Sequence, residues 1–384
     1  MSNAAEMNAD TVAGLPEADR LEGFTPPRAV SGFFGHRAAE QALLEAFAAK
    51  RLHHAWLFAG AEGVGKATLA YRFARFLLAQ GEDSEGSGAR DLSISREHPV
   101  FSQIAALSHP DLLLLRRPWL ADRKRLATAI TISEARRLRH FVSRTAGAGT
   151  WRVVIIDRAD ELNTAAANAL LKNLDEPPEY CVFLLVCSAP GRLPVTIRSR
   201  CRTLRFSPLD ETELSNAISA AYDTAGLQQP PAEVISACLP LAQGSVGRAL
   251  RLLERGGSDM HARLLALIAG LPGLNHEAVH ALADELTASG SEGSYELFFD
   301  IAGETLARIV RHAATGEGAI GPEIALAQRL EGGRALAQWA QLWETVQRAK
   351  AEADVLNLDR KNLILGTFFR LEETARQALR SAGT

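Results

Sequence analysis

The segment Gly60–Lys66, with the sequence GAEGVGK, constrains the fold of this chain more than any other. It fits the pattern G-x-x-x-x-G-K and lies between a short apolar run, residues 55–59, and a helical pattern from residue 66 to about residue 80. A strand, a glycine-rich turn and a helix in this order are typical of a phosphate-binding loop, in which backbone N–H groups and a helix N-terminus surround an anion. The sequence therefore predicts an α/β domain with a phosphate site, in preference to an ordinary turn with an exposed lysine.

The loop supplies most of the candidate nucleotide-binding residues. The glycines Gly60, Gly63 and Gly65 let backbone N–H groups converge on the phosphates, and Lys66 would reach their β and γ oxygens. The next position, where such loops carry a Ser or Thr that ligates Mg²⁺, is alanine. Thr68 is the nearest hydroxyl and stays among the candidates, although one step along a helix turns a side chain by about 100°.

A second apolar run, Val153–Ile156, ends in Asp157 and matches the strand whose terminal carboxylate holds Mg²⁺ in phosphate-loop proteins. The next residue is Arg158, at a position where hydrolytic sites of this class have an acid that orients water. A guanidinium cannot accept a proton. Asp160 and Glu161 lie nearby, and we interpret them as surface charges at a helix start. With the metal-binding hydroxyl also missing, the sequence favours a nucleotide site that does not hydrolyse ATP.

Strand and helix patterns alternate up to about residue 207, which predicts a mostly parallel sheet covered by helices on both faces. The predicted strands are residues 55–59, 109–115, 153–156, 182–186 and 203–206. Beyond them the pattern is helical, with breaks at residues 270–273, 289–294 and 316–322, and residues 81–90 read as a flexible insertion. We predict a flexible tail over residues 1–30, an α/β phosphate-loop domain over 31–207, a three-helix lid over 208–258 and an all-α domain over 259–384.

Charge and cysteine usage narrow the class of protein. Lys and Arg number 42 against 45 Asp and Glu, and the net charge of −3 leaves no overall basic field for nucleic acid or an anionic membrane. The 4 cysteines contain no C-x-x-C pair, which disfavours a zinc module and a disulfide framework and favours a reducing cytoplasm. Because there is no apolar leader and no uncharged apolar run of about 18 residues, we expect neither export nor a membrane span.

Several motifs together resemble the bacterial sliding-clamp loaders of the AAA+ class. They are residues 53–58 (HHAWLF), the phosphate loop, residues 168–178 (NALLKNLDEPP) and residues 197–201 (IRSRC), which follow the family's order over about two thirds of the chain. The stretch 357–363 (NLDRKNL) is similar to C-terminal segments of the family. The resemblance implies an AAA+ fold. Within the family, the missing hydroxyl and acid favour a stator subunit that does not hydrolyse ATP over the gamma/tau motor.

The resemblance also implies roles for three residues outside the loop. Arg200 lies in a Ser-Arg-Cys motif whose arginine, in the family, reaches the ATP of the adjacent subunit; it would be catalytic in trans. The alternative is an ordinary surface arginine in a basic strand, residues 198–205. Arg248 falls at the sensor-2 position of the lid, or else is a solvent-facing helix arginine. Ser188 follows a strand where a polar sensor-1 residue is expected, or is a plain strand-end serine.

Partners follow from the same resemblance. They are the gamma/tau and delta clamp-loader subunits in a hetero-oligomer whose collar the all-α domain would build, with the sliding clamp and primed DNA reached through the complex. The chain would be a cytoplasmic subunit of a DNA-directed DNA polymerase holoenzyme, a nucleotidyltransferase complex, and not catalytic alone. The basic helix 132–144 carries arginines that either form a solvated cationic face or face DNA; they are Arg136, Arg137, Arg139 and Arg144.

Two cofactor questions and two other functions stay open at this point. ATP binding is undecided, and zinc is not predicted because residues 67–156, where many relatives carry a four-cysteine module, contain no cysteine. One alternative is an active ATP-hydrolysing AAA+ motor, such as a gamma/tau-like subunit, that tolerates Ala67 and Arg158. The other is an adaptor that holds ATP as a structural ligand, because Lys66 and the glycines are intact. Turnover by the isolated chain would support the first, and tight binding without turnover the second.

Overall fold

The computed structural model describes residue 17 and residues 21–80, 89–122, 124–143, 151–328, 333–356 and 358–382. It groups the chain into two compact units. The first is Met1–Gln229 with Ala242–Ala249, and the second is Pro230–Leu241 with Leu250–Thr384. Most of the predicted insertion (residues 81–88), Arg144 of the basic helix and Asn357 of the C-terminal motif lie outside the described residues.

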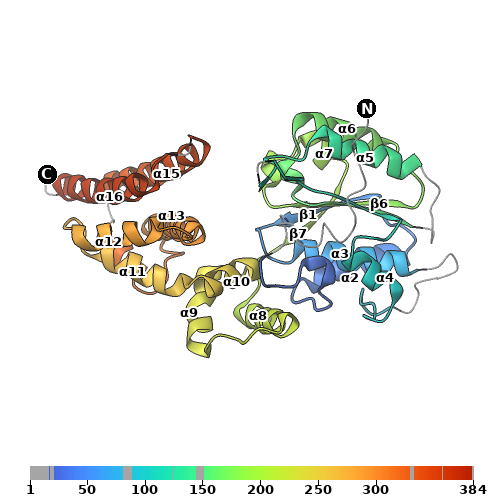
Figure 1. Ribbon diagram of the computed structural model, residues 1–384, viewed down its shortest axis with the longest axis horizontal. Coiled ribbons are helices and arrows are strands. Elements are labelled where there is room, and N and C mark those ends of the chain that lie inside the picture. Colours follow the sequence, from blue (N-terminus) through green and yellow to red (C-terminus); the bar gives the residue numbers. More distant parts are fainter. Residues whose placement is uncertain are drawn as a thin grey trace. The chain divides into compact units, whose positions relative to one another are not determined.

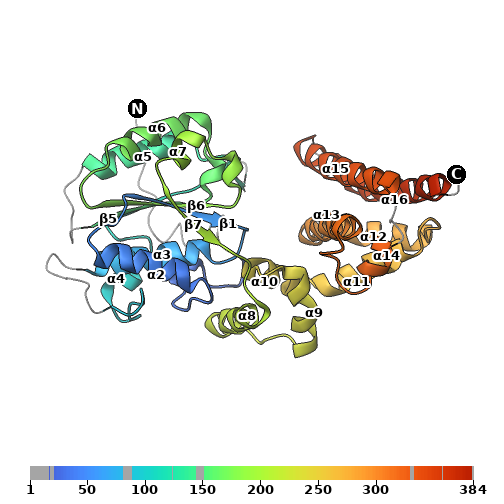
Figure 2. The same ribbon diagram turned by 180° about the vertical axis from the view of Figure 1, so that it is seen from behind.

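Within the described residues, a five-stranded parallel sheet forms the centre of the first unit (Figures 1 and 2). Most strands are near-continuous apolar runs, because both faces of the sheet are buried. One edge strand, residues 202–206 (RTLRF), is the exception and buries only Leu204 and Phe206. The predicted parallel α/β architecture is therefore confirmed. The strand order is β2 (Leu112–Leu115), β5 (Arg152–Ile156), β6 (Cys181–Cys187), β1 (Ala55–Gly60) and β7 (Arg202–Phe206).

Helices cover the sheet on both faces (Figure 1). On one face lie α2 (Arg37–Ala48), α3 (Lys66–Ala79) and α4 (Pro99–Ala105), and on the other α5 (Ile132–Ser143), α6 (Thr164–Asp175) and α7 (Val195–Arg198). Alternate residues of β1 enter two separate hydrophobic clusters: Trp56 and Phe58 pack on the side of α3, and Leu57 packs on the side of α6. A single strand thus anchors both helical layers.

Residues 21–30, which fall in the predicted tail, pack against the first unit. Phe24 is 5% exposed, and its ring meets the ring of Tyr222 in α8 (Glu211–Ala225) edge-on, with 5.2 Å between centroids. In η1 (Pro27–Ala29), the carbonyl of Arg28 accepts a hydrogen bond from Arg75 of α3 at 2.8 Å. Residues 1–16 and 18–20 lie outside the described residues.

Short elements account for most differences from the predicted pattern. Strand β2 begins at Leu112, not at residue 109, because the backbone N–H of Asp111 donates to the His109 ring at 3.1 Å and forms a turn there. Helices α4 and α7 and the antiparallel pair β3 (Trp119–Leu120) and β4 (Arg125–Leu126) were not predicted. Segments this short span too little of a hydrophobic period to be recognised.

Only helices follow β7 in the described part of the chain. The predicted lid range, residues 208–258, contains three complete helices, which are α8, α9 (Ala232–Ala242) and α10 (Val246–Glu254). The compact units separate them, because α8 and the start of α10 group with the sheet and most of α9 with the later helices. The predicted boundaries at residues 207 and 258 therefore stay a prediction. No helix among the described residues is long and apolar enough to cross a membrane.

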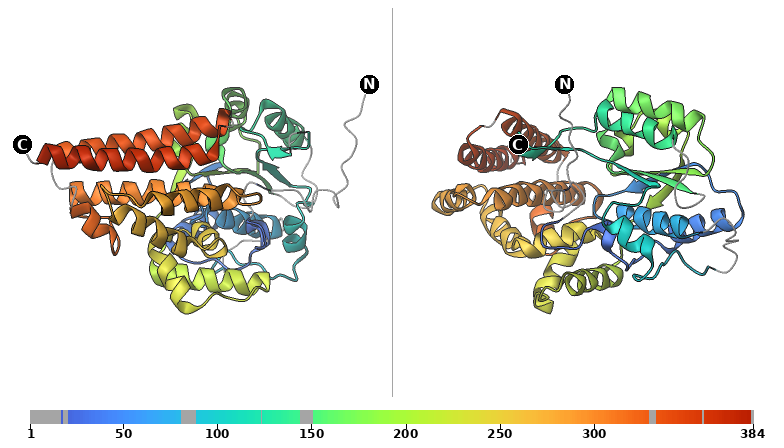
Figure 3. Two further views of the ribbon diagram at one scale, coloured as in Figure 1. Left: turned by 60° about the vertical axis from the view of Figure 1, so that its left-hand side comes forward. Right: turned by 45° about the vertical axis from the view of Figure 1, so that its right-hand side comes forward.

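The second unit continues with six further helices in its described part. Helix α15 packs against both α13 and α16, and α13 also contacts α11 and α14 (Figure 3). Helix α13 begins inside the predicted break at residues 289–294. The bounds are α11 (Gly257–Ala269), α12 (His276–Thr287), α13 (Glu292–Thr315), α14 (Glu323–Gln328), α15 (Gly333–Leu356) and α16 (Arg360–Ala382).

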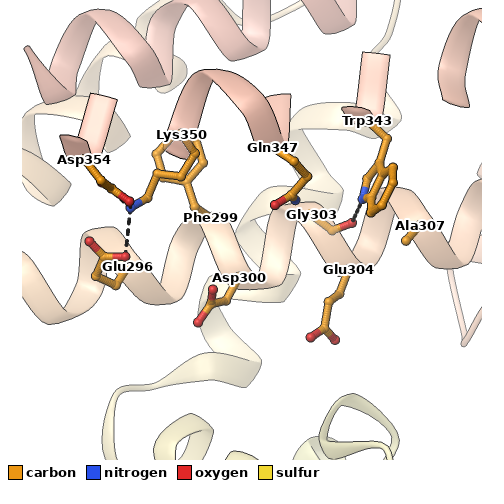
Figure 4. A pocket seen from close by; sticks show the side chains of 10 residues that line it. All are labelled: Glu296, Phe299, Asp300, Gly303, Glu304, Ala307, Trp343, Gln347, Lys350 and Asp354. Atoms are coloured by element: carbon orange, nitrogen blue, oxygen red, sulfur yellow. Dashed lines mark hydrogen bonds and ion pairs between the residues drawn. The ribbon is translucent and has the colours of Figure 1, made fainter. Parts of the chain in front are cut away.

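A hollow of about 350 Å³ lies along α13 and α15 (Figure 4). At one end, Lys350 of α15 donates to Glu296 at 2.9 Å and to Asp354 at 2.7 Å. At the other end, the indole of Trp343 donates to the carbonyl of Gly303 at 2.9 Å. An added Cβ at Gly303 would lie 2.1 Å from the side-chain amide nitrogen of Gln347 on α15, so this amide lies directly over the glycine. The polar contacts at both ends fasten α13 to α15.

Candidate functional site

The phosphate loop connects β1 to α3, as predicted. Gly63 and Gly65 have φ angles of 75° and 106°, in the left-handed region that favours glycine. Gly60 is required for a different reason, because a Cβ there would lie 2.5 Å from the carbonyl oxygen of Phe206 on β7. Helix α3 begins at Lys66, so the N–H groups of its first turn have no acceptor within the helix. This local geometry fits a phosphate group.

Lys66 is buried in the loop, with 4% of its surface exposed. Its Nζ donates to the carbonyl oxygens of Gly60 at 2.8 Å and Ala61 at 2.5 Å. Burial lowers the pKa of Lys66 to about 8, although nearby carboxylates act in the opposite direction. The ammonium group therefore lies inside the phosphate loop and donates to loop carbonyls. A bound phosphate would take over some of these hydrogen bonds.

Ser188, at the end of β6, contacts this lysine. Its Oγ accepts a hydrogen bond from Lys66 Nζ at 3.1 Å, and its backbone N–H donates to Asp160 Oδ1 at 3.0 Å. Glu161 in turn accepts a bond from Arg158 at 3.1 Å. Asp160 and Glu161 do lie at a helix start, in η2 (Ala159–Glu161), but both are half-buried and bonded to residues of the site, so they are not plain surface charges. The sensor role of Ser188 stays a prediction.

Asp157 directly follows β5 and has 4% of its surface exposed, and Arg158 comes next in a left-handed conformation with φ of 52°. The Arg158 guanidinium donates to Glu62 Oε1 at 2.5 Å and to Glu161 Oε1 at 3.1 Å. Burial alone would lower the pKa of Arg158, but Glu62 and Glu161 together raise it. Glu62 belongs to the phosphate loop, so the Arg158 ion pair connects this loop to the end of β5. The guanidinium occupies the position where a hydrolytic site would have a base.

The N-terminus of α10 also contacts the loop. Ser245 is buried, and its Oγ donates to the carbonyl of Glu62 at 2.7 Å. The backbone N–H of Gly247 donates to the carbonyl of Gly63 at 3.1 Å. The proposed sensor-2 residue Arg248 is half-buried on the same helix, and its backbone N–H donates to Ser245 Oγ at 3.2 Å. The structure thus brings the helix that carries Arg248 to the phosphate loop.

These residues fit a nucleotide phosphate better than a magnesium ion. The loop, Lys66 and Asp157 are in place, whereas Ala67 offers no oxygen at the position of the metal-binding hydroxyl. Thr68 lies in the first turn of α3, rotated by about 100° from that position. The metal side of the site therefore lacks one oxygen ligand.

Arg200 lies near the opposite end of the parallel strands from the phosphate loop. Strands β7 and β1 run parallel, with Arg202 level with Trp56 and Phe206 level with Gly60. Four residues at about 3.3 Å each put about 13 Å between these two levels, and Arg200 precedes β7 by two more residues. The structure therefore does not bring Arg200 together with the other predicted site residues, and Arg200 cannot act on a phosphate held in its own loop.

Arg200 does not lie in a strand, contrary to the alternative interpretation of a surface arginine in a basic strand. It follows α7 in a turn, and β7 begins only at Arg202. Its Nε donates to Asp175 Oδ1, and its Nη1 donates to the carbonyl of Thr196 at 2.8 Å. With 36% of the side chain exposed, the guanidinium is held by its own chain and still reachable from solvent.

The basic helix α5 presents Arg136, Arg137 and Arg139 at the surface. Arg137 pairs with Glu134 one turn earlier at 2.6 Å. A carboxylate neutralises one of these arginines, so a solvated face and a DNA-facing surface both remain compatible with α5.

Sequence reasoning missed the residues that join the loop to distant parts of the first unit. They are Glu62, Ser245, Gly247 and His36, whose Nε2 lies 2.8 Å from the carbonyl of Val64. Partners separated by 96 or 183 residues leave no local pattern in a sequence. One signal was available: the acid at position 62 and the arginine at position 158 carry complementary charges at two positions that phosphate-loop folds bring close together.

The first part of the chain is similar to known replication proteins. A family model described as DNA polymerase III, delta subunit, matches residues 35–210. The chain is 34% identical over 227 residues to DNA polymerase III subunit delta′ of Pseudomonas aeruginosa, covering 59% of this chain and 64% of that protein. It is 31% identical over 231 residues to DNA polymerase III subunit tau/gamma of Haemophilus influenzae, covering 60% of this chain and 31% of that protein. The matches thus span less than two thirds of either relative.

A solved structure of a DNA polymerase III gamma subunit-related protein from Thermotoga maritima covers 87% of this chain and all of its own, at 17% identity and a TM-score of 0.36. DNA polymerase III subunit delta′ of Escherichia coli is 32% identical over 225 residues, covering 58% of this chain and 60% of that protein.

Proposed function

The chain belongs to the clamp-loader family of DNA polymerase III, and we propose that it serves there as a stator of the delta-prime type. Its partners are gamma/tau and delta subunits, and the assembled complex places a sliding clamp on primed DNA. The chain does not turn over ATP itself. It supplies Arg200 to the ATP of a gamma/tau neighbour.

The state of Arg158 carries this proposal. A hydrolytic water needs a carboxylate next to the strand-end aspartate, and here a guanidinium occupies that position and is paired with Glu62 and Glu161. To move the Arg158 guanidinium away from this position, both ion pairs would have to break, and one of them is made with the phosphate loop itself. Relatives of both the delta′ and tau/gamma types match at about 30% identity, so the choice of a stator depends on these site residues.

The position of Arg200 supports action in trans. Its distance along the sheet from the chain's own loop leaves only a nucleotide on another subunit within reach. An arginine that stabilises charge at a transferring phosphoryl group contributes on the order of 10³ to 10⁵ in rate where this has been measured. The helical second unit supports the same proposal, because it offers long helices suited to assembly.

A second candidate, a structural nucleotide, is favoured by one observation. Lys66 and the three loop glycines keep the geometry of a phosphate site, although the metal side lacks an oxygen ligand. ATP or ADP bound without turnover would then brace the first unit, and this is compatible with a stator.

The test is reconstitution with gamma/tau and delta from the same organism. DNA- and clamp-stimulated ATP turnover is measured for the wild type, Arg200→Ala and Lys66→Ala. We expect Arg200→Ala to lower turnover by at least tenfold and Lys66→Ala to change it less than twofold. Loss of turnover in Lys66→Ala, or ATP hydrolysis by the isolated chain, would identify a motor instead and sink the proposal.

A further inference from the structure

We propose that Asp175 is a positioning residue for Arg200, holding its guanidinium ready for the ATP of the neighbouring subunit. The inference rests on the proposed role of Arg200 in trans and adds a second residue to it. Asp175 is the last residue of α6, and Arg200 lies 25 residues further along the chain.

Two hydrogen bonds fix the plane of the Arg200 guanidinium. Nε donates to Asp175 Oδ1, and Nη1 donates to the carbonyl of Thr196 at 2.8 Å. A guanidinium has five N–H donors in a rigid fork, so these two bonds leave three donors for a ligand. Nη2 makes no hydrogen bond to any residue that the structure describes, and this end of the fork is the one a phosphate can approach.

The backbone on both sides of this pair is anchored in the core. Leu174, next to Asp175, is 2% exposed, and Ile197 of α7 is fully buried in the same hydrophobic cluster. Cys201, which follows Arg200, packs against that cluster as well. Since neither backbone segment can shift without disturbing the core, the carboxylate and the guanidinium meet at a fixed place.

The stability of α6 does not explain an acid at this position. The C-terminal end of a helix carries partial negative charge, and a carboxylate in the last turn is unfavourable there. The pair with Arg200 is 48% exposed on the aspartate side and 36% on the arginine side. An ion pair this open to water adds little to folding. What it does determine is the direction of a long, flexible side chain.

Orientation before docking has a direct kinetic consequence. A free arginine side chain samples many rotamers, and a neighbour's phosphate must select one of them. With Nε bound to Asp175, the donors of Nη2 and the remaining donor of Nη1 reach phosphate oxygens without that search. Loss of the carboxylate should therefore lower kcat for the neighbour's ATP and leave its KM unchanged, because the ATP pocket itself belongs to the other subunit.

The experiment uses the full complex with clamp and primed DNA, and measures kcat and KM for ATP. The variants are Asp175→Ala, Asp175→Asn, Asp175→Glu, Arg200→Ala and the double variant Asp175→Ala/Arg200→Ala. We expect Asp175→Ala to lower kcat about three- to tenfold, Asp175→Asn to have a smaller effect, and Asp175→Glu to retain most of the rate. The double variant should match Arg200→Ala alone, because Asp175 acts through Arg200. Glu179→Ala, another exposed acid of this region, is the control and should behave as wild type.

Each failure has its own signature. If Arg200→Ala lowers turnover but Asp175→Ala and Asp175→Asn do not, the positioning role is overturned while the stator function stands. If Asp175→Ala lowers turnover by the same factor with and without Arg200, the aspartate acts by another route and the proposal is also overturned. If Arg200→Ala has no effect, the trans role itself fails. The isosteric Asp175→Asn variant gives the answer should the alanine variant not assemble.

Discussion

Glu62 and Arg158 form an ion pair between the phosphate loop and the end of β5. The strand end has an arginine in the place of an acid, and the loop has an acid that pairs with it at 2.5 Å. Around Lys66 the chain thus carries two cations against the carboxylates of Glu62, Asp157 and Asp160. Single side chains, not a different backbone, therefore account for the proposed loss of hydrolysis.

Lys66 gives a pH-dependent test of this crowded site. Burial lowers its pKa to about 8 in the folded protein, against 10.5 as the usual value. Between these two values the unfolded chain binds a proton that the folded protein has released, so stability rises with pH. Relative to Lys66→Met, the wild type should gain up to about 3 kcal/mol from pH 8 to pH 10.5. The measurement is the difference in unfolding free energy between the two proteins along this range.

The comparison with the methionine variant cancels the titration of tyrosines and cysteines, which both proteins share. A difference that stays constant from pH 7 to pH 10.5 would show that the Lys66 ammonium is solvated in the folded protein.

At the scale of elements, α10 and the phosphate loop form one contact surface. The helix meets the loop through Ser245 and Gly247, and Gly63 makes the approach possible. Here backbone carbonyls of the loop and the start of α10 are joined directly, so the first unit is held together without a ligand.

Gly63→Ala tests this contact. An added Cβ would lie 2.5 Å from Ser245 Oγ and 3.0 Å from the backbone N of Gly247, at a φ of 75°. Left-handed strain and overpacking together should lower the unfolding free energy by about 2–4 kcal/mol. The control is Gly226→Ala, which has a φ of 67° and no atom within 4 Å of the added Cβ, and which should cost only about 1–2 kcal/mol. Chemical denaturation of both variants measures the difference. If both substitutions lower the unfolding free energy equally, α10 can move away from the added methyl group without loss of stability.

Elements differed in how well the sequence predicted them. Helix α8 lies in the predicted lid and has clear end signals in the sequence, because Asp210 caps its first turn and Gly226 ends it in a left-handed conformation. Helix α7 was missed, because its four residues are defined by contacts with α6 and not by a period. The site shows the same division. The loop and Lys66 follow from a local motif, whereas the pairings of Arg158 with Glu62 and of Arg200 with Asp175 arise only when distant segments fold together.

At the scale of the whole molecule, a buried carboxylate joins three helices of the second unit. Glu323 of α14 is fully buried and accepts hydrogen bonds from Arg308 of α13 at 2.6 Å and from His261 of α11 at 2.8 Å. A helix of six residues is not stable alone in water. The buried carboxylate therefore holds α14 to two other helices of the second unit.

Glu323→Gln should destabilise the second unit selectively. It removes the carboxylate that the Arg308 guanidinium, 4% exposed, contacts at 2.6 Å, and among the described residues leaves only the more distant Glu304 at 3.7 Å. Breaking a buried pair in this way costs about 3–5 kcal/mol. In differential scanning calorimetry we expect the transition of the second unit to fall by roughly 10 °C or more, while that of the sheet unit is unchanged. Glu317→Gln, an exposed acid close by, is the control and should leave both transitions in place.

Glu323→Gln should also remove the part of the pH dependence of stability that the Glu323 carboxylate causes. Burial alone would raise the pKa of Glu323, but hydrogen bonds from His261 and Arg308 outweigh it and hold the pKa below the usual value of 4.5. The stability that the carboxylate contributes is therefore present above pH 4.5 and lost as the pH falls through the lowered pKa. The gap between wild type and Glu323→Gln should narrow between pH 6 and pH 3. A gap that is the same at both ends, or a single transition that shifts as a whole, would mean that this ion pair does not secure the second unit on its own.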